Sequence, residues 1–174
     1  MSTLYVDNLQ PNLGSGVSIP GHVMQVEHAI LATSLTQSSA TTDLISISVV
    51  AKGNNSKFLL RGALSFSTNQ GSNNTDQTEY RVSFTRDGSK VGGHNLWGTN
   101  VFYTCDVLSS YGTTFDTRQA TGEHLDAPAA SAGDTLVFTL RCQNGSSTAY
   151  INRGSGNSNT GSHLTYLTVM EIAQ

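Results

Sequence analysis

The sequence predicts an all-β protein, an antiparallel β-sandwich of jelly-roll type with eight or nine short strands and an extended N-terminal arm. Three observations favour it. Apolar and polar residues alternate through most of the 174 residues, and no stretch keeps the 3.6-residue period of a helix. Turn signals recur every ten to fifteen residues or so. Only 12% of the residues are charged, and Gly, Ser, Thr and Asn are abundant instead, as polar turns between strands require.

The first 21 residues differ from the rest, and we expect an arm over residues 1–21 followed by one domain over 22–174. Prolines and glycines in this segment exclude a helix. Its apolar residues need a partner surface, either on this domain or on another chain, and we favour another chain. The residues expected to attach are Leu4, Val6, Leu9, Leu13, Val17 and Ile19.

The first three strands are predicted over residues 24–30, 45–49 and 58–66, where apolar residues recur at every second position. A polar loop is expected over 34–42 and a turn at Gly53-Asn54-Asn55-Ser56, because Gly and Asn tolerate positive φ. Gly62 lies inside the third strand, where a glycine indicates a bulge or close packing.

The middle of the chain predicts a strand over 80–84, a hairpin turn at Asp87-Gly88 and a strand over 101–107. Polar loops are expected before and after these strands. Residues 109–123 form the longest stretch without alternation, so we expect an irregular segment there, with only a short strand at 124–126.

The last part predicts strands over 136–142 and 149–151, joined by the strong hairpin signal Asn144-Gly145, and then a Gly/Ser/Asn loop over 154–161. The strand Leu164–Ile172 is apolar on both faces. We therefore expect it to be central in its sheet and paired on both edges. Because this strand nearly ends the chain, attachment is expected to run through the N-terminal arm.

Charge and hydropathy argue against two classes of partner. The net charge is −3 and no Lys/Arg cluster exists, whereas nucleic-acid binding needs concentrated positive charge. No apolar run approaches the roughly 20 residues of a transmembrane helix, so membrane insertion is not expected. The N-terminus lacks the basic and apolar regions of a signal peptide, which predicts synthesis in a cytoplasm.

No motif predicts catalysis, a metal or a cofactor. None of the five histidines stands at the close spacing typical of metal ligands, and His28 is expected to be a packed or interface residue. A nucleophile elbow is absent and no pair of carboxylates is distinguished. Cys105 and Cys142 are in phase with apolar residues, so we expect buried reduced thiols, with a disulfide as the alternative.

One loop pattern suggests sugar binding. Trp97 is the only tryptophan and stands among polar residues, and sugars stack on aromatic rings while amides bond their hydroxyls. The alternative is that Trp97 closes one end of the sandwich or lies in a subunit interface. The candidate glycan contacts are His94, Asn95, Trp97 and Tyr111.

Two segments carry a resemblance to a known family. They are Ile19-Pro20-Gly21-His22-Val23-Met24-Gln25-Val26 and Leu167-Thr168-Val169-Met170-Glu171-Ile172-Ala173-Gln174. Together they resemble virion surface proteins of tailed bacteriophages, particularly cyanophages. The resemblance covers nearly the whole chain by pattern but only about twenty residues by motif. It implies a jelly-roll domain, commonly trimeric, displayed on a fibre or a capsid.

The expected function is therefore that of a non-enzymatic virion structural protein. We favour a capsid decoration (cement) protein, because the chain carries no long fibre shaft. It would form a homotrimer on the virion surface, with the major capsid protein or tail proteins as partners. The alternative is a short tail fibre or receptor-binding tip that recognises host surface glycans. A cellular lectin or tumour-necrosis-factor-like domain is a weaker alternative with the same fold.

Overall fold

The computed structural model describes residues 20–38, 41–68, 78–91, 103–107, 116–144, 148–152 and 164–174. Over these residues the prediction of an all-β antiparallel fold is confirmed, since they form eleven strands and no helix. The strands are β1 (Val23–Leu31), β2 (Leu35–Ser38), β3 (Thr41–Val50), β4 (Lys57–Thr68), β5 (Thr78–Arg86), β6 (Ser89–Val91), β7 (Tyr103–Val107), β8 (Asp116–Asp126), β9 (Thr135–Asn144), β10 (Thr148–Ile151) and β11 (Thr165–Ile172).

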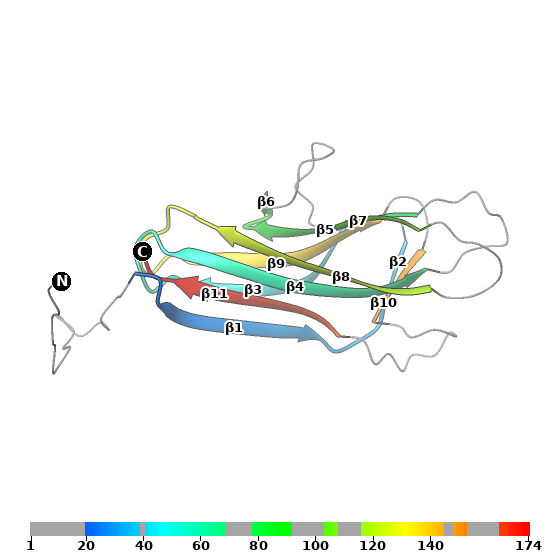
Figure 1. The fold of residues 1–174 in the computed structure, drawn as a ribbon, viewed down its shortest axis with the longest axis horizontal. Coiled ribbons are helices and arrows are strands. Elements are labelled where there is room, and N and C mark those ends of the chain that lie inside the picture. The colour runs from blue at the N-terminus through cyan, green and yellow to red at the C-terminus, as the bar shows by residue number, and fades with distance from the viewer. Residues whose placement is uncertain are drawn as a thin grey trace, which may run out of the picture.

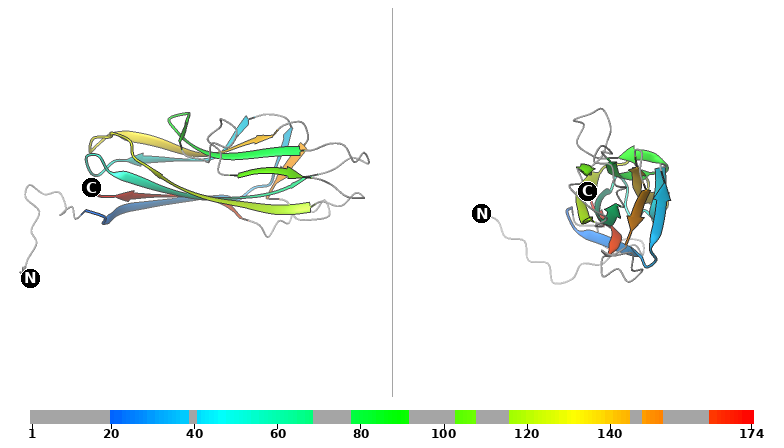
Figure 2. Two further views of the ribbon diagram at one scale, coloured as in Figure 1. Left: turned by 45° about the horizontal axis from the view of Figure 1, so that its top comes forward. Right: turned by 90° about the vertical axis from the view of Figure 1, so that its right-hand side faces the viewer.

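The strands form a six-stranded and a five-stranded sheet, which pack face to face as Figures 1 and 2 show. Four strands of each sheet make up the body of the sandwich. One sheet has the order β1-β11-β4-β8 and the other the order β3-β9-β5-β7. The chain crosses between the sheets at most of its connections, so neighbours in a sheet are distant in sequence. This two-sheet order, built from Greek keys, is the jelly roll. The predicted fold class is confirmed by the connectivity.

Three short strands add to these eight and explain why more strands are present than the eight or nine expected. β10 pairs with the far half of β4, and β2 pairs with β10, so both extend one sheet at one end. β6 pairs with the end of β5 through the turn at Asp87 and Gly88. Both turn residues have positive φ, 49° and 81°, which confirms the hairpin predicted there.

The core lies between the two sheets and is built from the inward-facing residues of each strand. Phe58 and Phe138 come from opposite sheets, and their ring centroids are 5.1 Å apart. Gly62 in β4 shows the close packing that its position predicted. A Cβ at Gly62 would lie 2.9 Å from Cε1 of Phe84, which belongs to the opposite sheet. The pairing of Gly62 with Gly122 on β8 is regular, so no bulge is present there.

The final strand lies where its two apolar faces predicted. β11 pairs with β1 on one edge and with β4 on the other. Its inward residues alternate with half-buried outward ones along its whole length. An antiparallel strand between two neighbours satisfies its backbone on both sides, so this strand joins the first strand of the domain to the centre of the sheet.

Two predictions about loops were wrong. Residues 116–123 belong to β8, an eleven-residue strand that pairs with β4 along its whole length. β8 is an edge strand, and the small residues Ala120 and Gly122 occupy inward positions, so it lacks the apolar alternation that marks a strand in sequence. Similarly, the loop expected over 34–42 contains β2 and the start of β3.

Candidate functional site

The site residues predicted from sequence lie outside the described residues. This holds for the six apolar residues of the arm and for His94, Asn95, Trp97 and Tyr111. Both remain predictions. The geometry that bears on function therefore comes from two other places, which are the point where residue 20 joins the domain and the outward face of the β1-β11-β4-β8 sheet.

The start of the described chain is fixed to its C-terminal end. The amide of Gly21 donates to the carbonyl of Ala173 at 2.9 Å, and the amide of Ala173 donates to the carbonyl of His22 at 2.9 Å. Gly21 has φ +81°, a conformation that residues with a Cβ rarely adopt. Whatever precedes residue 20 therefore leaves the domain from a defined point beside the end of β11 (Figure 1).

A buried carboxylate stabilises this end of the sandwich. Glu171 is fully buried and faces inward from β11. Its oxygens accept hydrogen bonds from the amide of Lys52 at 2.9 and 3.1 Å and from the amide of Gly53 at 3.0 Å. The side-chain amide of Gln25 also donates to it. Because its donors come from β1 and from the turn after β3, Glu171 ties β1, β11 and this turn together.

The outward face of the β1-β11-β4-β8 sheet carries an apolar row that crosses all four strands. Strand pairing places Val26, Met170, Leu59 and Leu125 side by side in that order. Val26 is 52% exposed and Leu125 49% exposed, while the two middle residues are half-buried. Four adjacent apolar side chains on the surface of a sheet form a patch of the kind that marks interaction sites.

A polar row runs beside it, one step along the strands, and is formed by His28, Thr168, Arg61 and Glu123. The Nδ1 atom of His28 lies 2.8 Å from the hydroxyl oxygen of Thr168. The guanidinium of Arg61 forms an ion pair with Glu123, with a distance of 2.9 Å between Nε and Oε2. The row is thus polar but has no net charge when His28 is neutral.

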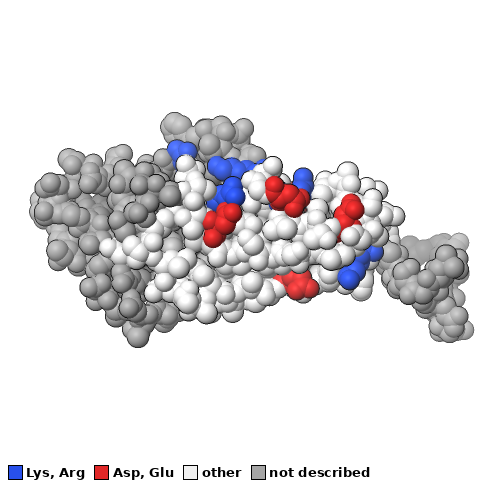
Figure 3. Space-filling view, turned by 180° about the vertical axis from the view of Figure 1, so that it is seen from behind, with Lys and Arg blue, Asp and Glu red and all other residues white. Residues whose placement is uncertain are grey.

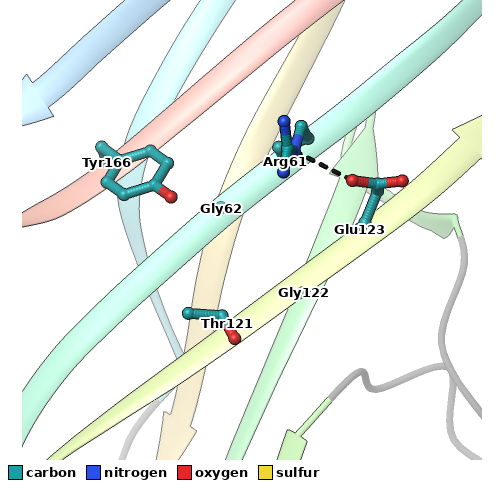
Figure 4. A pocket seen from close by; sticks show the side chains of 6 residues that line it. All are labelled: Arg61, Gly62, Thr121, Gly122, Glu123 and Tyr166. Carbon is teal, nitrogen blue, oxygen red and sulfur yellow. Dashed lines mark ion pairs between the residues drawn. The ribbon is translucent and has the colours of Figure 1, made fainter.

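A third row follows on the other side of the polar one and is formed by Ile30, Tyr166, Ala63 and Thr121. Beside Tyr166 the surface is hollowed by about 280 Å³. Figure 4 shows the ring of Tyr166 on one side of this hollow, Thr121 on another and the Arg61–Glu123 pair on a third. The outward residue between Tyr166 and Thr121 is Ala63, whose side chain is small. Gly62 and Gly122 line the hollow with backbone, because their side-chain positions face the core.

The outward face of the opposite sheet has a different character. Figure 3 shows that side of the molecule, where a few acidic and basic side chains, some of them adjacent, lie among uncharged ones. Ser46, Ser48 and Thr139 occupy its outward positions on β3 and β9, and Arg141 forms an ion pair with Asp43. Val137, at 37% exposed, is the large apolar residue exposed on the outward face of β9. Val50 on β3 is also exposed, at 47%, but it pairs with Thr135 while Val137 pairs with Ser48. Among the side chains described on β3 and β9, exposed apolar residues therefore do not form a row.

The cysteine prediction can be tested for one residue. Cys142 is a free thiol and fully buried, as expected. Burial raises the pKa of this thiol to about 12, because the thiolate would lose its hydration. Cys105 belongs to β7, and its side chain is not among those that the structure describes.

The described residues were searched for clustered metal ligands and for membrane-spanning helices. Within those residues no group of three or more His, Cys, Asp or Glu side chains is placed to hold a metal ion. The same residues contain no helix of the length and apolarity needed to cross a bilayer.

Sequence reasoning found the components of the apolar face but not the face itself. Met24, Val26, His28 and Ile30 were expected to share one side of the first strand. Val26, His28 and Ile30 do, whereas the pairing register shifts between Val23 and Gln25, so Met24 falls out of this phase. A period of two does not say which side of a strand faces solvent, and it does not say which strands are neighbours. An outward apolar row becomes visible only after β1, β11, β4 and β8 are placed in order.

Comparisons with known proteins leave the chain without an assigned family. No protein family model matches it, and no curated protein sequence matches it. Solved structures with a similar fold include chains from infectious bursal disease virus Gt strain, the T13 particle of the same virus, and its Gx strain. The identities are 15%, 16% and 14%, with TM-scores of 0.46, 0.45 and 0.42. The matches cover 98% of this chain but only 43%, 39% and 42% of those chains.

Proposed function

We propose that the chain is a non-enzymatic structural protein of a virus particle. Its most specific form is a capsid decoration (cement) protein that self-associates as a homotrimer and binds the particle through residues 1–21. The sequence resemblance to virion proteins of tailed bacteriophages supports this proposal. The jelly roll is compatible with it, since this architecture occurs in viral capsid domains, although it also occurs in lectins and so does not decide the function.

The observation that carries the proposal is the way the N-terminal segment leaves the domain. Gly21 and His22 are bonded to Ala173, and Glu171 fixes the neighbouring strands and turn. The segment before residue 20 contains the six apolar residues expected to attach and joins the domain at this hydrogen-bonded end. Such a segment can add a strand to an exposed sheet edge of a capsid protein, which gives main-chain hydrogen bonds and pockets for Leu4 and Val6.

Deletion of residues 1–19 tests this attachment. Pro20 and Gly21 remain, so the bonds between Gly21, His22 and Ala173 can still form and the domain is expected to stay folded. The shortened chain and the full chain are each mixed with particles that lack the protein, and binding is measured by co-sedimentation. We expect the full chain to bind and the shortened chain to lose at least about 90% of the binding, equivalent to a tenfold weaker association.

A circular dichroism spectrum and a thermal melt of the shortened chain serve as the control for folding. Normal binding of a folded chain without residues 1–19 would refute attachment through the arm. The number of copies per particle separates the two virion roles, because a capsid decoration protein is present in hundreds of copies and a tail component in a handful. A tail position would favour the alternative function, recognition of host surface glycans.

A further inference from the structure

We propose that the outward face of the β1-β11-β4-β8 sheet is a self-association surface. A second copy of this chain packs against it about a two-fold axis that runs along the strands, between β11 and β4. This goes beyond the proposed function, because a two-fold contact joins copies, or whole trimers, in pairs and is distinct from the contacts that would close a homotrimer. The contact itself is argued from the arrangement of side chains on the face and can be tested with the purified chain.

The axis follows from the order of the strands. A two-fold axis that lies between β11 and β4 exchanges β1 with β8 and β11 with β4, while each row of side chains stays at its own level. In the first row, Val26 then faces Leu125 of the second copy. In the same row, Met170 faces Leu59 of the second copy. The four apolar residues of each copy therefore meet only apolar residues, which removes the exposed row from water.

The other two rows are complementary under the same operation. In the polar row, His28 faces Glu123 of the second copy, a donor or cation against a carboxylate. In the third row, Tyr166 faces Ala63 of the second copy, at the edge of the hollow. A large ring opposite a small residue fills the empty space, as interdigitated sheet faces require. Both copies do this at once, so the contact is symmetric.

Charge favours a second copy over a partner of another kind. The three rows contain one positive residue, Arg61, and one negative residue, Glu123, which already form an ion pair. A strongly acidic or basic partner finds no opposite net charge here, whereas a copy of the same face brings one residue of each sign. Self-complementary surfaces of this kind are characteristic of isologous interfaces.

The size of the face sets the expected strength. Four strands about 4.8 Å apart, with eight residues of about 3.3 Å each, cover roughly 500 Å². Two such faces bury on the order of 1,000 Å², the lower limit for a specific interface. The contact should therefore be reversible, with a dissociation constant in the micromolar range, rather than a permanent dimer interface.

Paired charge substitutions test the contact and its geometry. The full chain is studied by sedimentation velocity between about 1 and 200 µM, a range chosen around the expected dissociation constant. For the wild type we expect the mass of the sedimenting species to double with concentration. Val26→Lys alone and Leu125→Glu alone should each weaken this association at least about tenfold, because each places a charge opposite an apolar residue.

The double variant Val26→Lys/Leu125→Glu should restore the association, because each new lysine faces a new glutamate of the second copy. Within one copy the two positions are three strand spacings apart, about 14 Å, too far for a direct ion pair. Val137→Lys is the matched control, since Val137 is also an exposed valine but lies on the opposite sheet, and it should leave the association unchanged. Thermal melts verify that every variant is folded.

Four results would overturn the proposal. They are a wild type that keeps one mass over the whole range, an association that both single variants leave unchanged, a double variant that is no better than either single one, and loss of the association when residues 1–19 are deleted. The last result would mean that the association depends on residues 1–19 and not on this face alone.

Discussion

At the residue scale, Cys142 couples stability to pH. The thiol is buried and its pKa is raised to about 12, from an ordinary value of 9.0. Between these values the folded chain keeps the proton and the unfolded chain loses it. Deprotonation therefore favours unfolding, so the contribution of Cys142 is fully present below pH 9 and is lost as the pH rises towards 12.

The expected result is a decline in the free energy of unfolding of the wild type, relative to Cys142→Ala, of up to about 1.4 kcal/mol per pH unit above pH 9. Urea unfolding at pH 8, 9, 10 and 11 measures it for both proteins. Lysines, tyrosines and Cys105 titrate in both, so their effects cancel in the difference. A difference that does not change with pH would contradict the raised pKa.

At the element scale, Glu171 determines how firmly β1 and the turn after β3 are joined to β11. Glu171→Gln replaces one acceptor oxygen by an amide nitrogen, which then faces the donors from Lys52 and Gly53 or from Gln25. We expect the free energy of unfolding to fall by about 1 to 3 kcal/mol, the usual cost of an unsatisfied buried polar group. Urea unfolding at pH 7 measures this change.

Glu27→Gln is the matched control, because Glu27 lies on β1 as an exposed residue. It should change stability by no more than about 0.5 kcal/mol. Equal effects of the two substitutions would mean that the buried hydrogen bonds of Glu171 contribute little. Hydrogen exchange offers a second measurement, since Glu171→Gln should increase the exchange of the amides of residues 52 and 53.

The elements also show what a sequence can and cannot predict. β11 was predicted to be central because apolar residues on both of its faces require cover from both sides. β8 was missed because an edge strand needs few apolar residues, and its inward Ala120 and Gly122 are too small to mark a face. The turn at Asp87-Gly88 was predicted because its conformation is local, which the pairing of distant strands is not.

The same limit applies to the candidate site. His28 was expected to be packed or in an interface. In the single chain it is exposed and hydrogen-bonded to Thr168, 140 positions away in the sequence, and an interface role stays a prediction. The apolar row joins residues from positions 26, 59, 125 and 170. No local pattern contains that information, because it depends on the order of strands in the sheet.

At the scale of the whole molecule, the approach of the two sheets sets how the sandwich can be filled. Gly62 on β4 shows how closely they approach, because a Cβ there would lie 2.9 Å from Cε1 of Phe84 and 3.2 Å from Cδ1 of Leu140, both on the opposite sheet. Both neighbours are fully buried, so neither ring nor methyl can move aside without disturbing the core. A single methyl group here acts on the spacing between the sheets.

Gly62→Ala should therefore reduce the free energy of unfolding by about 1 to 3 kcal/mol, the usual cost of overpacking a core, although alanine is the better residue for a regular strand. Equilibrium unfolding in urea measures the loss, and Ser48→Ala, on the solvent side of β3, is the control. Gly62→Ala combined with Phe84→Leu should recover part of the loss, because the shorter side chain leaves room for the methyl group. If Gly62→Ala were as stable as the wild type, Phe84 and Leu140 would have to make room for the methyl group without cost, and the core between the sheets would be more loosely packed than these distances indicate.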